Sequence, residues 1–122
     1  MSRDSLRTLA RAVFVVAALV VVIGSLTPAA EMPEIEVSDK IQHFAAYAGL
    51  AFLAKIAWRP PGFLGWPLAS VVIAGPAIEL LQFLVPGRSA SVGDAVADVM
   101  GVAVGVLCGV AVRRLLPPSS PA

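Results

Sequence analysis

Apolar residues fill four long stretches of this 122-residue chain, and short segments rich in proline and glycine separate them. A helix rises about 1.5 Å per residue, so about 17 to 25 apolar residues cross a hydrocarbon core of about 30 Å. Each stretch is close to that length. The pattern therefore predicts an all-α, single-domain membrane bundle spanning residues 1–122, with four transmembrane helices at about 6–26, 41–58, 63–85 and 92–112.

Basic residues are divided unevenly between the two sets of predicted loops. Seven of them precede the apolar run that begins at residue 12, lie near the second turn or follow the fourth helix: Arg3, Arg7, Arg11, Lys55, Arg59, Arg113 and Arg114. The opposite side holds only Lys40 and Arg88, together with several acidic residues. Lysine and arginine are enriched in short cytoplasmic loops. We therefore expect both termini to be cytoplasmic and the turn at Arg88 to be external.

The first apolar stretch has a second interpretation, as a cleaved signal peptide. Basic residues precede its apolar run, and the small residues around Ala29 and Ala30 follow. Pro28 fits such a cleavage site poorly, and removal of the segment would leave three crossings with a less even charge balance. A retained first helix is the favoured prediction.

Composition narrows the class of protein further. Hydrophobic residues make up 58% of the chain, whereas soluble domains have about 45–50%. The net charge of +1 argues against a disordered chain and against a broad basic face for nucleic acid. The single cysteine, Cys108, excludes an intrachain disulfide and a cysteine-based metal cluster, and it is expected to be an inert apolar residue.

Polar residues interrupt the predicted second helix with a helical period. Asp39, His43 and Tyr47 are spaced four residues apart, so they share one face. Asp39 is the expected N-cap, in a D-x-x-Q capping box with Gln42. His43 then lies about 6 Å and Tyr47 about 12 Å inside the helix.

The third and fourth helices carry polar residues at a similar depth. Glu79 and Gln82 share a face close to the outer end of the third helix. Ser91 and Asp94 have the spacing of a capping box, so the fourth helix is expected to begin after Ser91. Asp98 then falls about 10 Å inside the membrane. Three helices thus deliver polar groups to one layer in its outer half.

Ionisable groups that face lipid are costly, so we expect His43, Glu79 and Asp98 to converge, with Arg88 as their counter-charge. The predicted ligand-binding residues are Asp39, His43, Tyr47, Glu79, Gln82, Arg88, Asp94 and Asp98. The alternative is a structural knot, meaning a network of hydrogen bonds between these residues that only fixes the register of the helices and binds no ligand. No metal is predicted, because His43, Glu79, Asp94 and Asp98 lack a recognised metal-ligand motif, although a divalent ion at these four residues is the weaker alternative. No cofactor is predicted.

Small residues recur every four positions along the fourth helix, at Ala97, Gly101, Gly105 and Gly109. Such a stripe permits close contact between helices. Packing inside the bundle is the favoured interpretation, and a homodimer through Gly101, Gly105 and Gly109 is the alternative. Lys55 is expected to extend to the cytoplasmic surface.

Three motifs are familiar in this order: Asp39-Lys40-x-x-His43-Phe44-x-x-Tyr47, Glu79-x-x-Gln82 and Pro86-Gly87-Arg88-x-x-Ser91-x-x-Asp94-x-x-x-Asp98-x-x-Gly101. They resemble the VanZ-like family of small bacterial membrane proteins, over the span from the first helix through the fourth. The resemblance implies a multi-pass protein of the bacterial plasma membrane. The founding member is associated with resistance to the glycopeptide antibiotic teicoplanin, and the family has no settled biochemical activity. The family commonly has Asn where this chain has Asp98.

Two classes of function fit these residues. In the first, a binding or accessory protein holds an envelope lipid, a lipid-linked precursor or a lipophilic glycopeptide antibiotic in an outward-facing polar pocket. Arg88 would contact an anionic head group there, while His43, Gln82 and Tyr47 orient it. In the second, a membrane enzyme acts on a lipid or cell-wall precursor at the outer leaflet, with Glu79 or His43 as general base. Transport or proton relay stays open.

Overall fold

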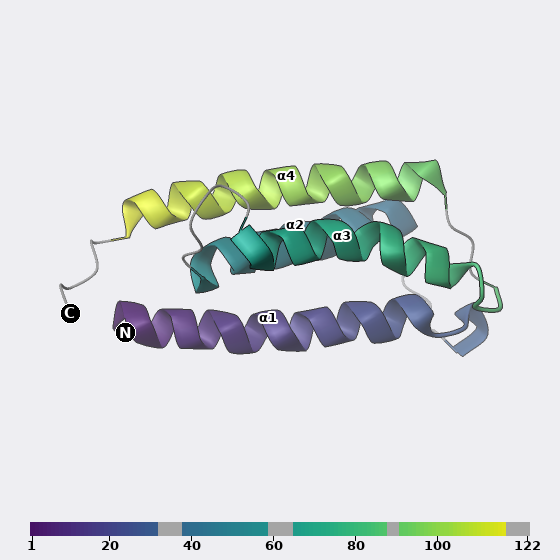
Figure 1. The fold of residues 1–122 in the computed structure, drawn as a ribbon, viewed down its shortest axis with the longest axis horizontal. Helices are drawn as coiled ribbons and strands as arrows, with labels where there is room; N and C mark the ends of the chain where they lie inside the picture. Colours follow the sequence, from purple (N-terminus) through teal and green to yellow (C-terminus); the bar gives the residue numbers. More distant parts are fainter. Residues whose placement is uncertain (32–37, 59–64, 88–90, 117–122) are drawn as a thin grey trace.

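The computed structural model describes residues 1–31, 38–58, 65–87 and 91–116 (Figure 1). Within these residues the chain forms four α-helices, one short 3-10 turn, η1 (Ala29–Glu31), and no strand. The helices are α1 (Arg3–Leu26), α2 (Asp39–Ala57), α3 (Gly65–Gln82) and α4 (Val92–Leu115). The predicted all-α fold with four helices is confirmed.

Serine side chains cap three of the helices. Ser2 accepts a hydrogen bond from the Ser5 backbone N–H at 3.0 Å, and Ser91 accepts one from Asp94 at 3.1 Å, as expected for the start of α4. The predicted cap of α2 is wrong. Ser38 is the N-cap and accepts from the Ile41 N–H at 3.3 Å, so Asp39 is the first helical residue. There its negative charge suits the positive end of the helix dipole.

Several helix bounds differ from the prediction. α1 begins at Arg3 instead of residue 6, and α2 spans Asp39–Ala57 instead of 41–58. α3 ends at Gln82 instead of residue 85, because the chain continues in tight turns in which the N–H groups of Leu84 and Val85 bond three residues back. α4 continues to Leu115 instead of residue 112, and its C-cap Leu116 still donates to the Val112 carbonyl at 3.1 Å. The predicted start of α3 at residue 63 lies outside the described residues.

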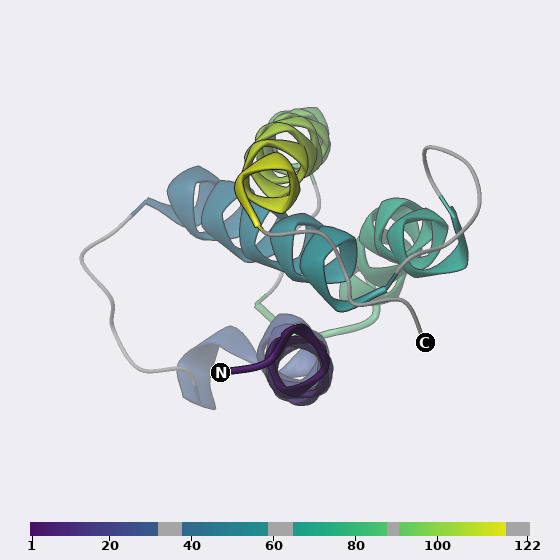
Figure 2. The same ribbon diagram turned by 90° about the vertical axis from the view of Figure 1, so that its left-hand side faces the viewer.

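α2 and α3 lie between α1 and α4 (Figures 1 and 2), and the most extensive packing joins α2 to α4. The small residues of α4 explain this close approach. A Cβ atom on Gly101 would collide with the Phe44 carbonyl oxygen, and one on Gly105 with the Ala48 carbonyl oxygen. The stripe therefore packs inside the bundle, as favoured above. The homodimer through Gly101, Gly105 and Gly109 stays a prediction that this burial does not favour.

Lys55 lies in the same α2–α4 interface. Its Cβ would be 2.6 Å from a Cβ on Gly109, and the residue is only 5% exposed. The expectation that Lys55 extends to the surface is therefore wrong. The missing side chain at Gly109 lets α4 come close enough to cover it.

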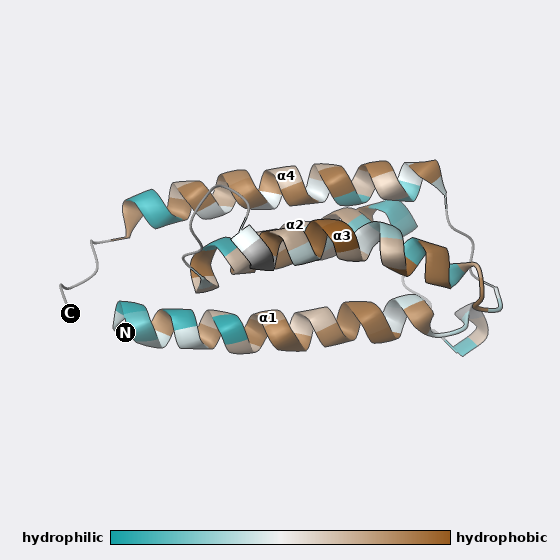
Figure 3. Ribbon diagram, viewed as in Figure 1, coloured by the Kyte–Doolittle hydropathy of each residue, from teal (hydrophilic) through white to brown (hydrophobic). Residues whose placement is uncertain are grey.

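Hydrophobic residues occupy most of the length of the helices (Figure 3). On α1, Val16, Leu19, Val20 and Ile23 are each more than half exposed. Among the described residues, α1 and α4 are long and apolar enough to cross a membrane, and a shorter apolar helix runs through Leu68–Gln82. Such continuous apolar exposure is typical of a surface that contacts lipid.

Candidate functional site

His43 lies at the centre of the polar groups and contacts a carboxylate on either side. Its Nδ1 is 2.8 Å from Oδ1 of Asp98 on α4, and its Nε2 is 3.9 Å from Oδ2 of Asp39, one turn earlier on α2. Asp98 can reach His43 because Gly101, less than a turn further along α4, packs directly against the α2 backbone at Phe44. The packing of small residues thus brings the imidazole and the carboxylate together.

Glu79 supplies a third group from a third helix. One potential ligand atom each of His43, Glu79 and Asp98 lies within 4.8 Å of the other two. The structure therefore brings together the three residues that the sequence places at one depth. Asp98 is 5% exposed, and Oε1 of Glu79 is buried with no hydrogen-bond partner. A buried polar atom without a partner costs about 1–3 kcal/mol, so this arrangement leaves one group unsatisfied.

Tyr47 is also buried and forms part of the same layer. Its ring and the Asp98 carboxylate meet at Gly75 of α3, where a Cβ atom would be 3.5 Å from Cε1 of Tyr47 and 3.6 Å from Oδ2 of Asp98. The phenol and the carboxylate therefore approach α3 at a position where α3 has no side chain.

Asp94 lies nearer the start of α4 and is 4% exposed. Its Oδ1 has no hydrogen-bond partner but forms an ion pair with Nζ of Lys40 at 3.7 Å. Ligand atoms of Asp39, His43 and Asp94 also lie within 4.8 Å of one another. Sequence reasoning used Lys40 for topology and in the quoted motif, and it missed this pairing. No spacing within one helix indicates the contact, because it joins α2 to α4.

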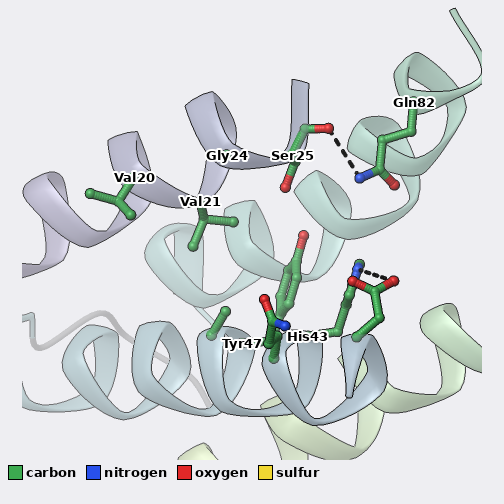
Figure 4. Close-up of a pocket in the computed structure, with 10 residues that line it drawn as sticks. Val20, Val21, Gly24, Ser25, His43, Tyr47 and Gln82 are labelled. Atoms are coloured by element: carbon green, nitrogen blue, oxygen red, sulfur yellow. Dashed lines mark hydrogen bonds and ion pairs between the residues drawn. The ribbon is translucent and has the colours of Figure 1, made fainter. Parts of the chain in front are cut away.

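A pocket of about 240 Å³ opens beside this cluster, between α1, α2 and α3. In Figure 4, Val20, Val21, Gly24 and Ser25 line it from α1, opposite His43 and Tyr47 of α2. Gln82 borders the pocket on α3 and donates from Nε2 to the Ser25 carbonyl at 3.1 Å. The full lining is Val20, Val21, Gly24, Ser25, Asp39, Gln42, His43, Ala46, Tyr47 and Gln82.

Four of the eight predicted site residues line this pocket: Asp39, His43, Tyr47 and Gln82. The pocket also includes Ser25 and Gln42, which the sequence analysis did not place in the site. Glu79 and Asp98 join the site through His43 instead. Arg88 lies outside the described residues. Binding roles for all eight stay predictions.

A second pocket, of about 180 Å³, shares Tyr47 with the first. Asp98 is its acidic residue, and most of the lining is apolar: Val71, Val72, Gly75, Pro76, Ala95, Val99 and Val102. The polar cluster therefore contributes His43 to a mixed pocket and Asp98 to an apolar one.

The chain matches the VanZ/LLP1 family model over residues 5–113, which is nearly its whole length. It belongs to the VanZ/LLP1 family. Neither the curated proteins nor the solved structures include a significant match. Membership of the VanZ/LLP1 family, together with two helices apolar enough to span a bilayer, indicates a membrane protein.

In this VanZ/LLP1 chain, polar contacts connect different helices. His43–Asp98 and Lys40–Asp94 join α2 to α4, and Gln82–Ser25 joins α3 to α1. These contacts can hold helix register, as a polar knot would. A knot alone does not account for the unpaired oxygen of Glu79 or for a pocket next to His43. The imidazole and carboxylates can also accept hydrogen bonds, exchange protons or bind a cation.

Proposed function

We propose that this chain is a multi-pass protein of the bacterial plasma membrane, in which all four helices cross and both termini are cytoplasmic. The helices run side by side along the length of the bundle (Figure 1). The start of α1 and the end of α4 lie at the same end of the bundle, where Arg3, Arg113 and Arg114 line a common pocket. The cluster around His43 would then lie in the outer half of the membrane, because basic ends stay cytoplasmic.

Within this topology, we propose that the 240 Å³ pocket binds the polar head group of an envelope lipid or of a lipid-linked cell-wall precursor. One observation carries the proposal: Val20 and Val21 form an apolar wall opposite the polar residues Asp39, Gln42 and His43. An amphiphile offers matching surfaces, with an apolar stem and a polar head.

The size of the pocket favours a lipid head group over a glycopeptide antibiotic. Sites for drug-sized molecules have volumes of about 300–1,000 Å³, so this pocket accommodates a head group better than a whole glycopeptide antibiotic. An accessory role in glycopeptide resistance, to which the family is linked, would then act through an envelope lipid. Arg88, outside the described residues, is the proposed partner for an anionic group on that lipid.

Pocket filling tests the proposal. Ala46 lines the pocket, whereas its neighbour Ala45 is exposed and lies outside the lining. The purified protein, Ala46→Leu and Ala45→Leu would be heated in detergent with and without total envelope lipid extract. We expect lipid to raise the Tm of the wild type and of Ala45→Leu, because a ligand at about 100 times its Kd stabilises by about 2.7 kcal/mol. Ala46→Leu should lose this increase.

Lipid mass spectrometry of the same preparations provides the identity of the ligand. A lipid that co-purifies with the wild type and Ala45→Leu, but not with Ala46→Leu, would be the ligand of the pocket, and its mass would identify the head group. An equal lipid-induced rise in all three proteins would reject the pocket as the binding site.

A further inference from the structure

The polar cluster contains a donor set that no local motif reveals. His43, Glu79 and Asp98 come from α2, α3 and α4, and one ligand atom of each lies within 4.8 Å of the others. We infer that these three side chains bind a divalent transition-metal ion, with Zn²⁺ as the preferred ion. This inference does not rest on the proposed function, since the ion would bind in the absence of a lipid.

The distances are close to those of a coordination sphere. Zinc ligands lie about 2.0–2.2 Å from the ion at tetrahedral angles, so any two of them are about 3.4 Å apart. The 2.8 Å between His43 Nδ1 and Asp98 Oδ1 is about 0.6 Å shorter than this separation. The 4.8 Å limit exceeds it by about 1.4 Å, which side-chain rotations can close.

Charge and burial also favour a cation. The carboxylates of Glu79 and Asp98 lie within 4.8 Å of each other, and like charges that close repel unless a proton or cation is shared. Oε1 of Glu79 is buried and has no hydrogen-bond partner, and Asp98 is 5% exposed. A metal ion would balance both charges and satisfy the unpaired oxygen at once.

The surroundings of His43 resemble the outer shell of a metal site. When Nδ1 binds the ion, the Nε2–H faces Oδ2 of Asp39 at 3.9 Å. Carboxylates beside the second nitrogen commonly orient histidine ligands. Asp94, 4% exposed and with an Oδ1 that has no hydrogen-bond partner, is a further carboxylate within reach of His43. Four acidic side chains thus surround a single imidazole.

The donor types select the class of ion. Ca²⁺ and Mg²⁺ are bound by oxygen ligands, whereas one imidazole nitrogen with two carboxylates suits Zn²⁺. Divalent-ion affinity generally increases from Mn²⁺ to Cu²⁺ and falls again at Zn²⁺. Three protein ligands also leave a coordination position open. His43 lines the larger pocket and Asp98 the apolar one, so the ion would lie between the two.

Calorimetry with the full chain in detergent tests the site directly. The affinity tag is removed, the protein is treated with chelator, and ZnCl₂, MnCl₂ and MgCl₂ are titrated without added lipid. We expect one Zn²⁺ per chain, weaker Mn²⁺ binding and no Mg²⁺ binding. Glu79→Gln and Asp98→Asn should each weaken Zn²⁺ binding more than 100-fold, because each removes a ligand. Asp39→Asn should weaken it about 10-fold, as expected for an outer-shell group.

Asp4→Asn is the matched control, since Asp4 is an exposed carboxylate on α1 that contacts Arg7. It should keep wild-type affinity. Circular dichroism of each metal-free variant shows whether it is folded, and Co²⁺ absorption of the wild type reports nitrogen and oxygen coordination independently. The inference is overturned if the wild type binds no Zn²⁺, if Glu79→Gln and Asp98→Asn keep full affinity, or if Asp4→Asn loses as much as they do. Lipid-induced stabilisation that survives these outcomes leaves the proposed function intact.

Discussion

At the end of the bundle where α1 begins and α4 ends, the described polar contacts accompany apolar packing. Arg11 donates from Nε to the Ala57 carbonyl at 3.1 Å and lies 5.8 Å from the ring of Trp58, which also packs edge-on against Phe14. At the opposite end, Glu79 and Asp94 each keep a buried oxygen without a hydrogen-bond partner. Polar groups at the first end are used in contacts that hold the helices together. At the second end, two carboxylate oxygens accept no hydrogen bond among the described residues and can bind a ligand.

The orientation of the two ends in the membrane has an all-or-none test. In a Cys108→Ala background, Glu31→Cys marks the end with the His43 cluster, and Ser2→Cys marks the end with the termini. An impermeant thiol reagent applied to intact spheroplasts should label only Glu31→Cys, because the basic end is expected to be cytoplasmic. Labelling of Ser2→Cys alone would reverse the proposed topology.

The contact between α2 and α4 runs from one end of the bundle towards the other. Weakening this contact should therefore have the next largest effect, a loss of stability. Gly105→Ala would force a Cβ against the Ala48 carbonyl, whereas Gly49 has no atom within 4 Å of an added Cβ. Overpacking costs about 1–3 kcal/mol, and alanine in an open helical position gains up to about 1 kcal/mol over glycine.

Thermal unfolding in detergent measures the difference. We expect a lower Tm for Gly105→Ala and an equal or higher Tm for Gly49→Ala. Equal Tm values for the two variants would show that the close α2–α4 contact is wrong.

Single substitutions at the two ends compare a residue whose polar groups have partners, Arg11, with one that has an unbonded buried oxygen, Glu79. Arg11→Ala should lose about 1–2 kcal/mol of stability, because a hydrogen bond to a charged group and a cation–π contact are removed. Glu79→Gln should leave metal-free stability unchanged or raise it, because it neutralises a partly unsatisfied buried carboxylate.

Arg114→Ala is the control for Arg11→Ala, since Arg114 is exposed at the same end. Chemical or thermal unfolding of the four proteins gives the comparison. A loss in Glu79→Gln as large as in Arg11→Ala would support the interpretation of the cluster as a structural knot.

The smallest effect concerns Lys40 and Asp94. The ion pair is 3.7 Å long and the Lys40 side chain is 62% exposed, so the pair should contribute less than about 1 kcal/mol. A double-mutant cycle with Lys40→Ala and Asp94→Asn measures the coupling free energy. A coupling free energy well above that value would show that this ion pair stabilises the fold, as the contacts of Arg11 do at the opposite end.

Local pattern was sufficient for much of the fold. The apolar stretches predicted four helices, because the length and hydropathy of a helix are properties of consecutive residues in the sequence. The capping box at Ser91 and Asp94 was readable for the same reason. The cap of α2 was predicted wrongly because Ser38 and Asp39 are both good N-caps, and the backbone conformation at Ser38 decides between them.

The sequence by itself also determined how far along each helix the polar residues lie, since helical rise and period follow from spacing alone. Only the tertiary structure decided their partners. His43 and Asp98 are 55 positions apart and meet because Gly101 and Gly105 let α4 pack against the α2 backbone. The three-helix donor set of His43, Glu79 and Asp98 has no spacing motif for the same physical reason: its geometry is set by packing between helices, not by the period within one.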